Sequence, residues 1–307
     1  MGETAEVVSS VSSLVILNQA ANRGNMQQHR YLVHQRLATL DAEYVETHDV
    51  ADARERARQA AQDGRAIIVV GGDGSVNAVV NGVLAAGRRV PLGIIPAGSG
   101  NDFACNTLGL PREPAEALER ALHGQLQSVD AGIVNGHYFA NGFSVGLDAD
   151  IADAANRMKK LPLMSGMRLY YSASLRQLLF GYQRCPWLQY RLDSDTPEHT
   201  AEKRYVLMAV TNGPTYGAGF RVNPQADPRD GCFDVCAINY VPLLRALRML
   251  PVMQKGQHTS APEASFYRAT TVHIESRLPV TMQVDGETMS LSSIDAQVLP
   301  GALLVRV

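Results

Sequence analysis

The sequence has no long hydrophobic run and no recognisable targeting segment. None of its apolar stretches approaches the roughly 20 residues that cross a bilayer as a helix. The N-terminus lacks both the basic region and the apolar core of a signal peptide. These absences exclude a helical integral membrane protein. They favour a soluble, cytoplasmic chain whose contacts with a membrane are peripheral.

Cysteine and excess charge are also scarce. Four cysteines in 307 residues do not make a disulfide framework, and no spacing of cysteine and histidine matches a zinc site. A net charge of −2 does not suggest a nucleic-acid partner. The Walker pattern Gly-x-x-x-x-Gly-Lys-Ser/Thr is absent, as are His-Arg-Asp and Asp-Phe-Gly, which excludes P-loop enzymes and protein kinases.

Apolar residues make up 46% of the chain, which is enough for two domains of ordinary size. In the first 128 residues, short apolar stretches alternate with stretches of helical character. We predict strands at 14–18, 44–47, 66–70 and 90–96, and helices at 27–40, 51–64, 76–84 and 114–122. This alternation predicts an α/β domain with a parallel sheet over residues 1–128.

From residue 129 onward the pattern changes to strands with few helices between them. Asn135-Gly136 is typical of a hairpin turn between two of these strands. The predicted strands lie at 129–134, 137–141, 187–192, 205–211, 232–238, 270–274, 280–284 and 303–307. We therefore predict a mostly antiparallel β-sandwich domain over residues 129–307.

Two helical segments interrupt these strands. The first, over 149–161 and 163–180, is rich in methionine and leucine and suits either an anionic membrane surface or an ordinary pair of packing helices. Among its cations are Arg157, Lys159, Lys160 and Arg168. The second segment, 242–254, has leucines at helical spacing, which we assign to the core.

A glycine-rich turn in the first domain has the form of an anion-binding site. Residues 71–77 read Gly-Gly-Asp-Gly-Ser-Val-Asn and join a predicted strand to a predicted helix. The first amides of a helix lack internal partners and attract negative charge, and glycines let a phosphate approach the backbone. Because the Asp73 carboxylate repels phosphate, we assign it to a Mg²⁺ ion or its water. A purely structural turn is the alternative.

A second turn of the same kind follows the next predicted strand. Residues 97–104 read Ala-Gly-Ser-Gly-Asn-Asp-Phe-Ala. Two such turns at neighbouring parallel strands open at the same edge of the sheet, where α/β folds bind ligands. The pair of turns therefore favours a phosphate-bearing ligand over a structural turn.

Together, these two turns resemble the diacylglycerol-kinase catalytic-domain family, which includes soluble bacterial lipid kinases, eukaryotic diacylglycerol kinases, and sphingosine and ceramide kinases. Ser75 and Ser99 stand where Thr is usual and keep its hydroxyl, whereas Gln19 replaces a usual proline. The resemblance implies that ATP is bound. The implied nucleotide-binding residues are Asn18, Thr47, Gly71, Gly72, Asp73, Gly74, Ser75, Asn77, Gly98, Ser99, Asn101 and Asp102.

A candidate general base lies late in the chain. Glu287 follows a predicted strand and the pair Asp285-Gly286, so the end of that strand would project its side chain. On its own the pattern fits a type I′ hairpin turn with solvated acids. In the resembled family, Asp-Gly-Glu at this late position carries the catalytic glutamate. The resemblance therefore implies that Glu287 is the base, with Asp73 acting beside it through the cation.

An acidic segment over residues 227–234 reads Asp-Pro-Arg-Asp-Gly-Cys-Phe-Asp and suits a hard cation, or else a solvated surface turn. The resemblance implies a structural Mg²⁺ held by Asp227, Asp230 and the backbone carbonyl of Cys232, since a thiol is a poor Mg²⁺ ligand. It also implies a water-mediated link from this site to the nucleotide domain. The residues of that link are Asp73, Asp102, Asp130 and Asp230.

We therefore predict an ATP- and Mg²⁺-dependent lipid kinase that acts at the inner membrane surface, with the acceptor entering between the domains. Diacylglycerol is the leading acceptor, and a sphingoid base, phosphatidylglycerol or another glycerolipid stays open, as does a homodimer. One rival is an NAD kinase, which shares the Gly-Gly-Asp-Gly turn. The other is a lipid- or nucleotide-binding protein without turnover.

Overall fold

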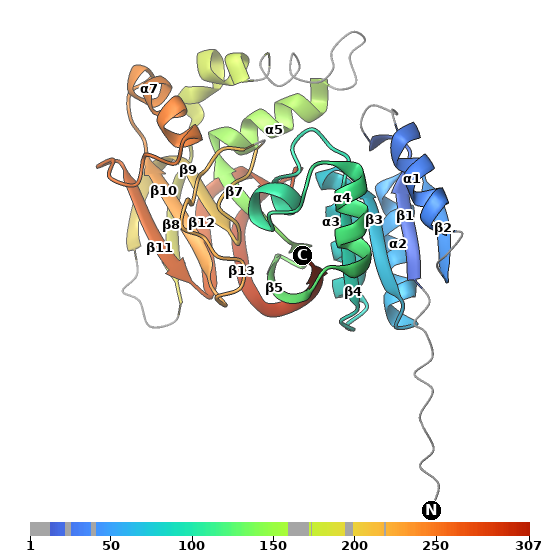
Figure 1. The fold of residues 1–307 in the computed structure, drawn as a ribbon. Helices are drawn as coiled ribbons and strands as arrows, with labels where there is room; N and C mark the ends of the chain where they lie inside the picture. The colour runs from blue at the N-terminus through green and yellow to red at the C-terminus, as the bar shows by residue number, and fades with distance from the viewer. Residues whose placement is uncertain are drawn as a thin grey trace, which may run out of the picture. The chain divides into compact units, whose positions relative to one another are not determined.

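The structure, a computed structural model, describes residues 13–21, 26–37, 41–158, 172, 174–193, 199–217 and 219–307. The chain divides into two compact units, shown as a ribbon in Figure 1. Unit 1 comprises residues 1–98, 110–127 and 303–307, and unit 2 comprises residues 99–109 and 128–302. A single cut at residue 128, as predicted from the sequence, differs from this division at two segments. Residues 99–109 belong to unit 2, and residues 303–307 belong to unit 1.

In unit 1, short strands alternate with helices along the chain. The elements are β1 (Ser13–Asn18), α1 (Gln27–Leu37), β2 (Ala42–Thr47), α2 (Val50–Gln62), β3 (Ala66–Gly71), α3 (Asp73–Ala85), β4 (Pro91–Pro96) and α4 (Pro114–His123). β1 pairs in parallel with β2 and with β3, and β3 pairs in parallel with β4. The strand order is therefore β2-β1-β3-β4, and the carboxyl ends of these strands share one edge.

Helices cover both faces of this sheet because its strands are apolar on both sides. Alternate residues of a strand point to opposite faces. Ile68 and Val70 of β3 belong to a cluster with apolar residues of α1 and α4, while Ile67 and Val69 are fully buried on the other face, where α2 and α3 contact the sheet. A Cβ atom at Gly82 of α3 would lie 2.3 Å from a backbone oxygen of α2, so these two helices are closely packed.

Unit 2 is built from antiparallel strands with helices between some of them. Its elements are the π-helix η2 (Asp102–Thr107), β5 (Leu126–Val134), β6 (His137–Phe139), β7 (Gly142–Gly146), α5 (Leu147–Met158), the short helices η3 (Gln177–Gly181) and η4 (Tyr182–Arg184), β8 (Trp187–Leu192), β9 (His199–Thr211), β10 (Phe233–Asn239), α7 (Leu243–Gln254), β11 (Ala264–Ala269), β12 (Thr271–Val284) and β13 (Glu287–Arg306). The first residues of β5 and the last residues of β13 lie in unit 1.

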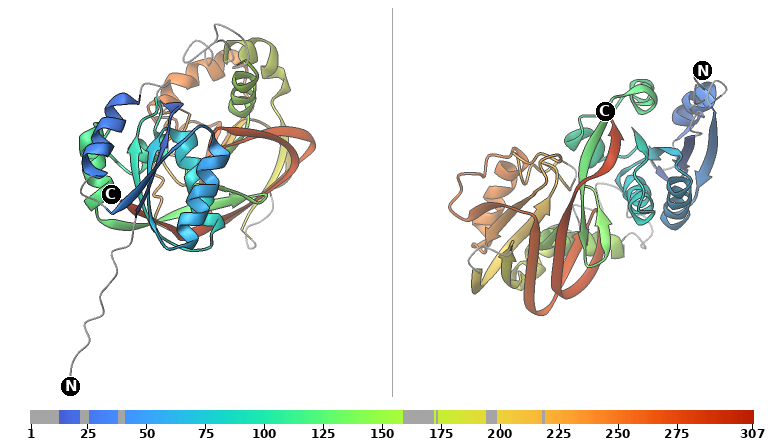
Figure 2. Two further views of the ribbon diagram at one scale, coloured as in Figure 1. Left: turned by 90° about the vertical axis from the view of Figure 1, so that its right-hand side faces the viewer. Right: turned by 90° about the horizontal axis from the view of Figure 1, so that it is seen from below.

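The main sheet of unit 2 has the strand order β11-β10-β9-β7-β12-β13, and each neighbouring pair among these strands is antiparallel. The long hairpin of β12 and β13 is visible in both views of Figure 2. β8 pairs with β9 and β12, and β6 pairs with β5, again in antiparallel fashion. The antiparallel strands predicted after residue 128 are thus confirmed.

The core of unit 2 follows from the alternation of side chains along β9. Met208 and Val210 face an apolar cluster that includes residues of β7, β8, β10, β12 and β13. Leu207 and Ala209 face the opposite side, where Met249 of α7 packs against them. The strands of this sheet are therefore covered on one face by other strands and on the other by α7.

Several predicted elements differ in extent. β12 is one strand with a shifted register between Glu275 and Val280, where the sequence predicted two separate strands. α1 is described as far as Leu37, and residues 38–40 lie outside the described residues. Lys159, Lys160 and Arg168 of the predicted basic stretch also lie outside them.

The assignment of the α7 leucines to the core is wrong for three of the four, since only Leu243 packs against an apolar cluster. Leu244 is 71% exposed, and Leu247 and Leu250 are 38% and 37% exposed. The buried side chains of α7 are Ala246, Met249 and Met253. Helical spacing identified an apolar helix, but α7 has apolar residues on two sides and only one of them packs against the sheet. Within the described part of the chain, no helix is long and apolar enough to cross a membrane.

Candidate active site

The carboxyl ends of β1, β2 and β3 bring three predicted nucleotide-binding residues of unit 1 together. Asn18 and Thr47 are paired in the register of β1 and β2. The Asn18 Nδ2 atom donates a hydrogen bond of 2.8 Å to Ser75 Oγ, in the first turn of α3. Thr47 is fully buried, and its hydroxyl donates a long bond of 3.5 Å to a β1 carbonyl. This edge of the sheet is therefore lined by hydroxyl and amide groups.

Thr47 does not cap the helix that follows it. The N-cap of α2 is Asp49, whose carboxylate accepts a bond of 2.8 Å from the Asp52 amide. Beside Thr47, the Glu46 carboxylate accepts hydrogen bonds from Arg30 at 2.7 and 2.8 Å and from Tyr44. The Arg30 bonds, with those of Tyr44 and Gln19, lower the pKa of Glu46 to about 2.

The glycine turn after β3 places the first amides of α3 at the edge of the sheet. Gly72 precedes α3 in an extended conformation, and no side chain caps the helix. The amides of Ser75 and Val76 both donate to the Gly72 carbonyl, at 2.9 and 3.1 Å. The amides of Asp73 and Gly74 therefore come before the first hydrogen bond of the helix. This is the arrangement that binds anions at helix N-termini.

Packing explains two of the three glycines in this turn, but not Gly74. A Cβ atom at Gly71 would lie 2.5 Å from the Ser75 side chain, and one at Gly72 would lie 3.0 Å from the Gly98 Cα atom. Among the described residues, a Cβ atom at Gly74 would meet no neighbour within 4 Å. Because the fold itself does not require glycine at this position, Gly74 favours a ligand that approaches the backbone there.

The start of the second turn lies beside the first. The Ala97 amide donates a hydrogen bond of 2.8 Å to the Gly71 carbonyl, which places Gly98 against Gly72. The edge predicted from the sequence thus exists within unit 1. Asn77 lies further along α3, where its carboxamide oxygen accepts a bond of 2.8 Å from the side chain of Asn81.

Ser99 and the residues of the second turn that follow it belong to unit 2. Asn101 has a positive φ of 58° and precedes the π-helix η2. Asp102 is buried and accepts a hydrogen bond of 2.8 Å from Asn106. The left-handed conformation of Asn101 turns the chain sharply into η2, so Asp102 is held by its own helix.

The hairpin interpretation of the Asp285-Gly286 pair is confirmed. Both residues have positive φ values, 43° and 94°, and Glu287 is the first residue of β13, paired with Val284. Glu287 is exposed. A hairpin turn and a catalytic role are compatible, because the turn fixes the backbone from which the Glu287 carboxylate projects.

Asp285 is a residue that the sequence reasoning missed. Its carboxylate accepts hydrogen bonds from the amides of Ala140, Asn141 and Gly142, at 2.9, 3.4 and 3.0 Å. The Asp285 amide in turn donates a hydrogen bond of 3.1 Å to the Gly142 carbonyl. The turn that carries Glu287 is therefore anchored to the start of β7. The partners lie more than 140 residues away in the chain, so no local pattern signals the contact.

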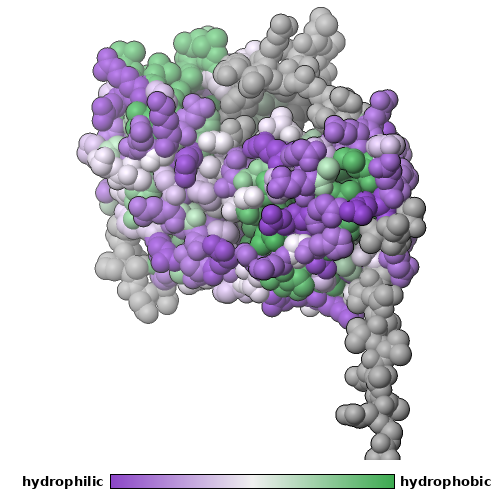
Figure 3. All heavy atoms as spheres, in the orientation of Figure 1, coloured by the Kyte–Doolittle hydropathy of each residue, from purple (hydrophilic) through white to green (hydrophobic). Residues whose placement is uncertain are grey.

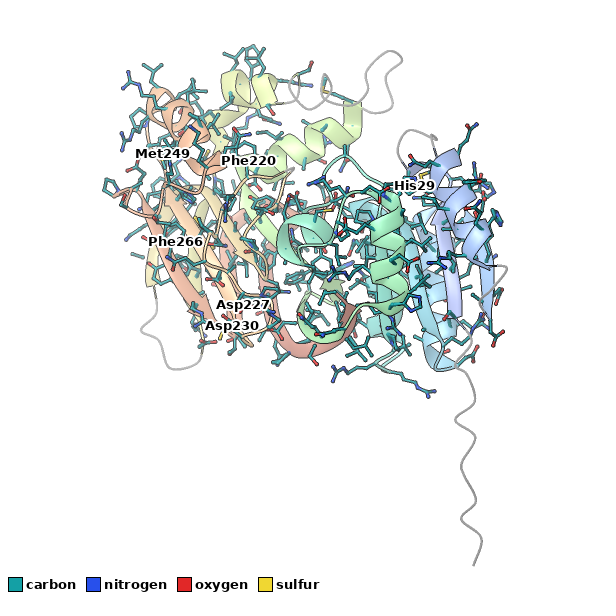
Figure 4. All side chains as sticks on the ribbon, in the orientation of Figure 1. His29, Phe220, Asp227, Asp230, Met249 and Phe266 are labelled. Carbon is teal, nitrogen blue, oxygen red and sulfur yellow. The ribbon has the colours of Figure 1, made fainter. Side chains whose placement is uncertain are left out.

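The acidic loop of unit 2 is closed by ion pairs and amide contacts. Asp227 pairs with Arg229 at 2.9 Å, and Asp230 pairs with Arg268. The two acids lie close together in Figure 4. The Cys232 amide donates a hydrogen bond of 3.1 Å to the Asp230 carboxylate. Among the described residues, no group of three or more His, Cys, Asp or Glu side chains is arranged to hold a metal ion.

Two further acids border this loop. Asp130 accepts hydrogen bonds from the amides of Gly231 and Gly301, at 2.8 and 2.6 Å, and so fixes the loop to the end of the sheet. Asp234 has a shielded carboxylate oxygen without a hydrogen-bond partner. Burial and the nearby charge of Asp230 raise the pKa of Asp234 to about 6. An unsatisfied carboxylate beside two other acids is a place where a cation would be stabilising.

Unit 2 also contains an apolar cavity of about 110 Å³ between α5, α7 and the central strands. Phe220 and Met249, labelled in Figure 4, are among its lining residues. Among its described lining residues the one acid is Asp148, which accepts hydrogen bonds from Ser144 and from Tyr216. The other Asp148 oxygen has no partner, and burial raises the pKa of this carboxyl.

Family models match both parts of the chain and identify the class of enzyme to which this fold and site belong. Residues 12–134 match the model of the diacylglycerol kinase catalytic domain, and residues 141–307 match the YegS C-terminal NAD kinase beta sandwich-like domain. The class is thus a lipid kinase, an enzyme that phosphorylates an alcohol group.

Individual relatives agree. A diacylglycerol kinase from Mycobacterium tuberculosis is 33% identical over 264 residues, covering 84% of this chain and 82% of the relative. A diacylglycerol kinase from Bacillus subtilis is 29% identical over 282 residues, covering 89% and 88%. The chain therefore belongs to the diacylglycerol kinase family of lipid kinases. A solved diacylglycerol kinase structure from Bacillus anthracis has the same fold, with a TM-score of 0.74 over 96% of both chains at 21% identity.

Proposed function

We propose that this protein transfers the γ-phosphate of ATP to the hydroxyl of a lipid, in a Mg²⁺-dependent reaction with diacylglycerol as the leading acceptor. The observation that carries the proposal is Gly74. It is a glycine at the start of α3 for which the protein's own packing gives no reason. A phosphate that approaches the two leading amides of α3 supplies that reason.

Unit 1 is proposed to bind the nucleotide at the carboxyl edge of its sheet. The amides of Asp73 and Gly74 receive phosphate oxygens, while Ser75 and Asn18 form a hydrogen-bonded pair beside them. Thr47, Gly71, Gly72, Asn77 and Gly98 shape this edge. Ser99, Asn101 and Asp102 of the second turn are the other residues proposed to bind the nucleotide.

Mg²⁺, when bound, neutralises the charge of the triphosphate. Asp73 is the residue proposed to hold that ion or its water, since it stands in the first turn of α3 beside the phosphate amides. A second, structural Mg²⁺ is proposed at Asp227, Asp230 and the backbone carbonyl of Cys232. The oxygen donors suit this hard cation, and the unpartnered oxygen of Asp234 is an observation in its favour.

Glu287 is proposed as the general base that takes the proton of the acceptor hydroxyl. Its support is its position at the first residue of β13, on a turn anchored through Asp285, with its carboxylate exposed. A carboxylate held on a rigid hairpin loses little freedom when a substrate binds beside it.

The acceptor is proposed to be held by unit 2. The apolar cavity between α5 and α7 gives a place for hydrocarbon, which a lipid acceptor has and NAD does not. The protein would then act in the cytoplasm as a peripheral enzyme of the membrane surface. Phosphatidylglycerol or a sphingoid base has the same chemistry of chain and hydroxyl, and a panel of lipids separates them.

The decisive experiment supplies labelled ATP and Mg²⁺ with diacylglycerol in mixed micelles, and in parallel with NAD. We expect label in the lipid. Glu287→Gln should lower the rate by about a hundredfold to ten-thousandfold while ATP binding persists. Glu275→Gln, which changes an exposed carboxylate of the same hairpin, is the matched control and should keep the native rate. Label in NAD alone, or a native rate in Glu287→Gln, contradicts the proposal.

A further inference from the structure

Helix α7 carries an apolar face that nothing in the described structure covers. Leu244, Leu247 and Leu250 follow one another at intervals of three residues, and all three are exposed. Ala246, Met249 and Met253 form the opposite, buried face. A surface helix normally shows one apolar stripe and one polar face. Among the described residues, the buried face of α7 therefore packs the helix against the sheet, and the second stripe is largely exposed apart from Leu250, which also lines the apolar cavity.

Further exposed apolar side chains lie next to α7. Leu175, Leu179 and Phe180 are 59%, 60% and 74% exposed. Leu178, in the same segment, lines the apolar cavity together with Leu250, so the segment and α7 are neighbours. We call the six exposed residues the apolar ridge: Leu175, Leu179, Phe180, Leu244, Leu247 and Leu250. In Figure 3, hydrophobic surface is visible at the upper left, over this part of unit 2.

The two segments that carry the ridge contain cations and no acids, while Asp150 and Asp153 of α5 line a pocket beside Phe180. Neither α7 nor residues 174–184 contain an aspartate or glutamate. The two segments and the residue after α7 carry five cations: Arg176, Arg184, Arg245, Arg248 and Lys255. Arg245 is paired with Glu263 at 2.7 Å, and Arg176 and Arg184 line a pocket together with Asp150 and Asp153 of α5. Arg248 and Lys255 are the other two cations. Apolar side chains rimmed by arginine and lysine are typical of helices that lie in the headgroup region of an anionic bilayer.

We propose that the apolar ridge is the surface by which this protein docks on an anionic lipid bilayer, with α7 lying in the plane of the interface. Leucines of α7 insert between the lipids, and Arg248 contacts the headgroup phosphates. The ridge and the apolar cavity share Leu250 and adjoin at Leu178. Docking therefore brings the cavity to the membrane, from which a lipid chain can enter it. This last step depends on the proposed lipid kinase function, but docking does not.

The test measures binding of the full-length protein to sedimenting vesicles, without ATP. The vesicles are phosphatidylcholine with and without phosphatidylglycerol. We expect the native chain to bind those that contain phosphatidylglycerol. Leu244→Gln/Leu247→Gln should lower this binding by about tenfold or more, since complete burial of one leucine is worth more than a factor of ten. Arg248→Glu should weaken binding to the anionic vesicles and leave the low binding to pure phosphatidylcholine unchanged.

Leu126→Gln is the matched control, because Leu126 is an exposed leucine of unit 1 and should be dispensable. Both leucine variants should phosphorylate micellar diacylglycerol at the native rate if the proposed function holds. A ridge variant that binds vesicles like the native protein overturns the inference. So does a native chain that binds no vesicles. Vesicle binding without any kinase activity would instead contradict the proposed function alone.

Discussion

The substitution Gly74→Ala separates a phosphate-binding turn from a structural one. A Cβ atom at Gly74 would meet no atom of the described part of the chain within 4 Å, and the residue stands in the first turn of α3. Alanine is a better helix former than glycine by up to about 1 kcal/mol. We therefore expect Gly74→Ala to leave stability unchanged or to raise the free energy of unfolding slightly, as measured by urea titration.

The same methyl group would stand where a phosphate oxygen must approach the Asp73 and Gly74 amides. A hydrogen bond to a charged group is worth about 1.5–3 kcal/mol, and 1.4 kcal/mol corresponds to a factor of ten in affinity. We expect the Kd for ATP, measured by titration calorimetry, to rise by about tenfold to hundredfold. A stable variant with impaired binding would be hard to explain by folding.

The control is Gly82→Ala in the same helix. Its Cβ atom would lie 2.3 Å from the Arg54 carbonyl oxygen, so α2 and α3 would have to separate. We expect a loss of about 1–3 kcal/mol in stability, with the ATP affinity of the folded protein unchanged. If Gly74→Ala binds ATP as tightly as the native chain, the phosphates do not approach this turn and the reasoning fails.

Two other substitutions test the geometry of the site. Asp285→Asn should lower turnover and leave the Kd for ATP unchanged, because it weakens the amide contacts that anchor the Glu287 turn; stability should fall by about 1–3 kcal/mol. A pH–rate profile shifted relative to the native enzyme would support a positioning role, and unaltered turnover would contradict it. Glu46→Gln should destabilise unit 1 at pH 7. Because folding lowers the pKa of Glu46, the ionised carboxylate stabilises the fold at pH values above its unfolded pKa, near 4.5. This stabilisation is lost as the pH falls toward about 2. The difference in unfolding free energy between native and variant should therefore shrink from pH 7 to pH 3, and a constant difference would refute the role of the charge.

Local chemistry made the turns and short strands predictable. The strand over Ala66–Gly71 is apolar on both faces and ends in glycine, and Asn135-Gly136 adopts the two positive φ values that its sequence favours, 45° and 83°. Asn18, Ser75 and Gly98 could be placed at one edge because parallel strands end on the same side. In each case the information lies within a few neighbouring residues.

The errors arise where the outcome depends on distant partners. The spacing of leucines in α7 does not reveal which of its two apolar faces packs, and this depends on Leu207 and Ala209 of a strand that precedes α7 by more than 30 residues. From the sequence, Asp285 is recognisable only as a turn residue. Its carboxylate also accepts hydrogen bonds from the amides of residues 140–142, which are distant in the sequence. Its sequence neighbours give no hint of them.

The parallel sheet of unit 1 is completed only by the end of β13, which is synthesised after unit 2. Leu304 and Val305 pair in parallel with β4, and Gln125 and Val307 exchange two backbone hydrogen bonds, all within unit 1. During synthesis, residues 303–307 leave the ribosome only after all of unit 2. Until then β4 has an open edge, which exposed strands use to aggregate. A fragment that stops short of residue 303 should therefore be prone to self-association, even though it contains every residue proposed to bind the nucleotide.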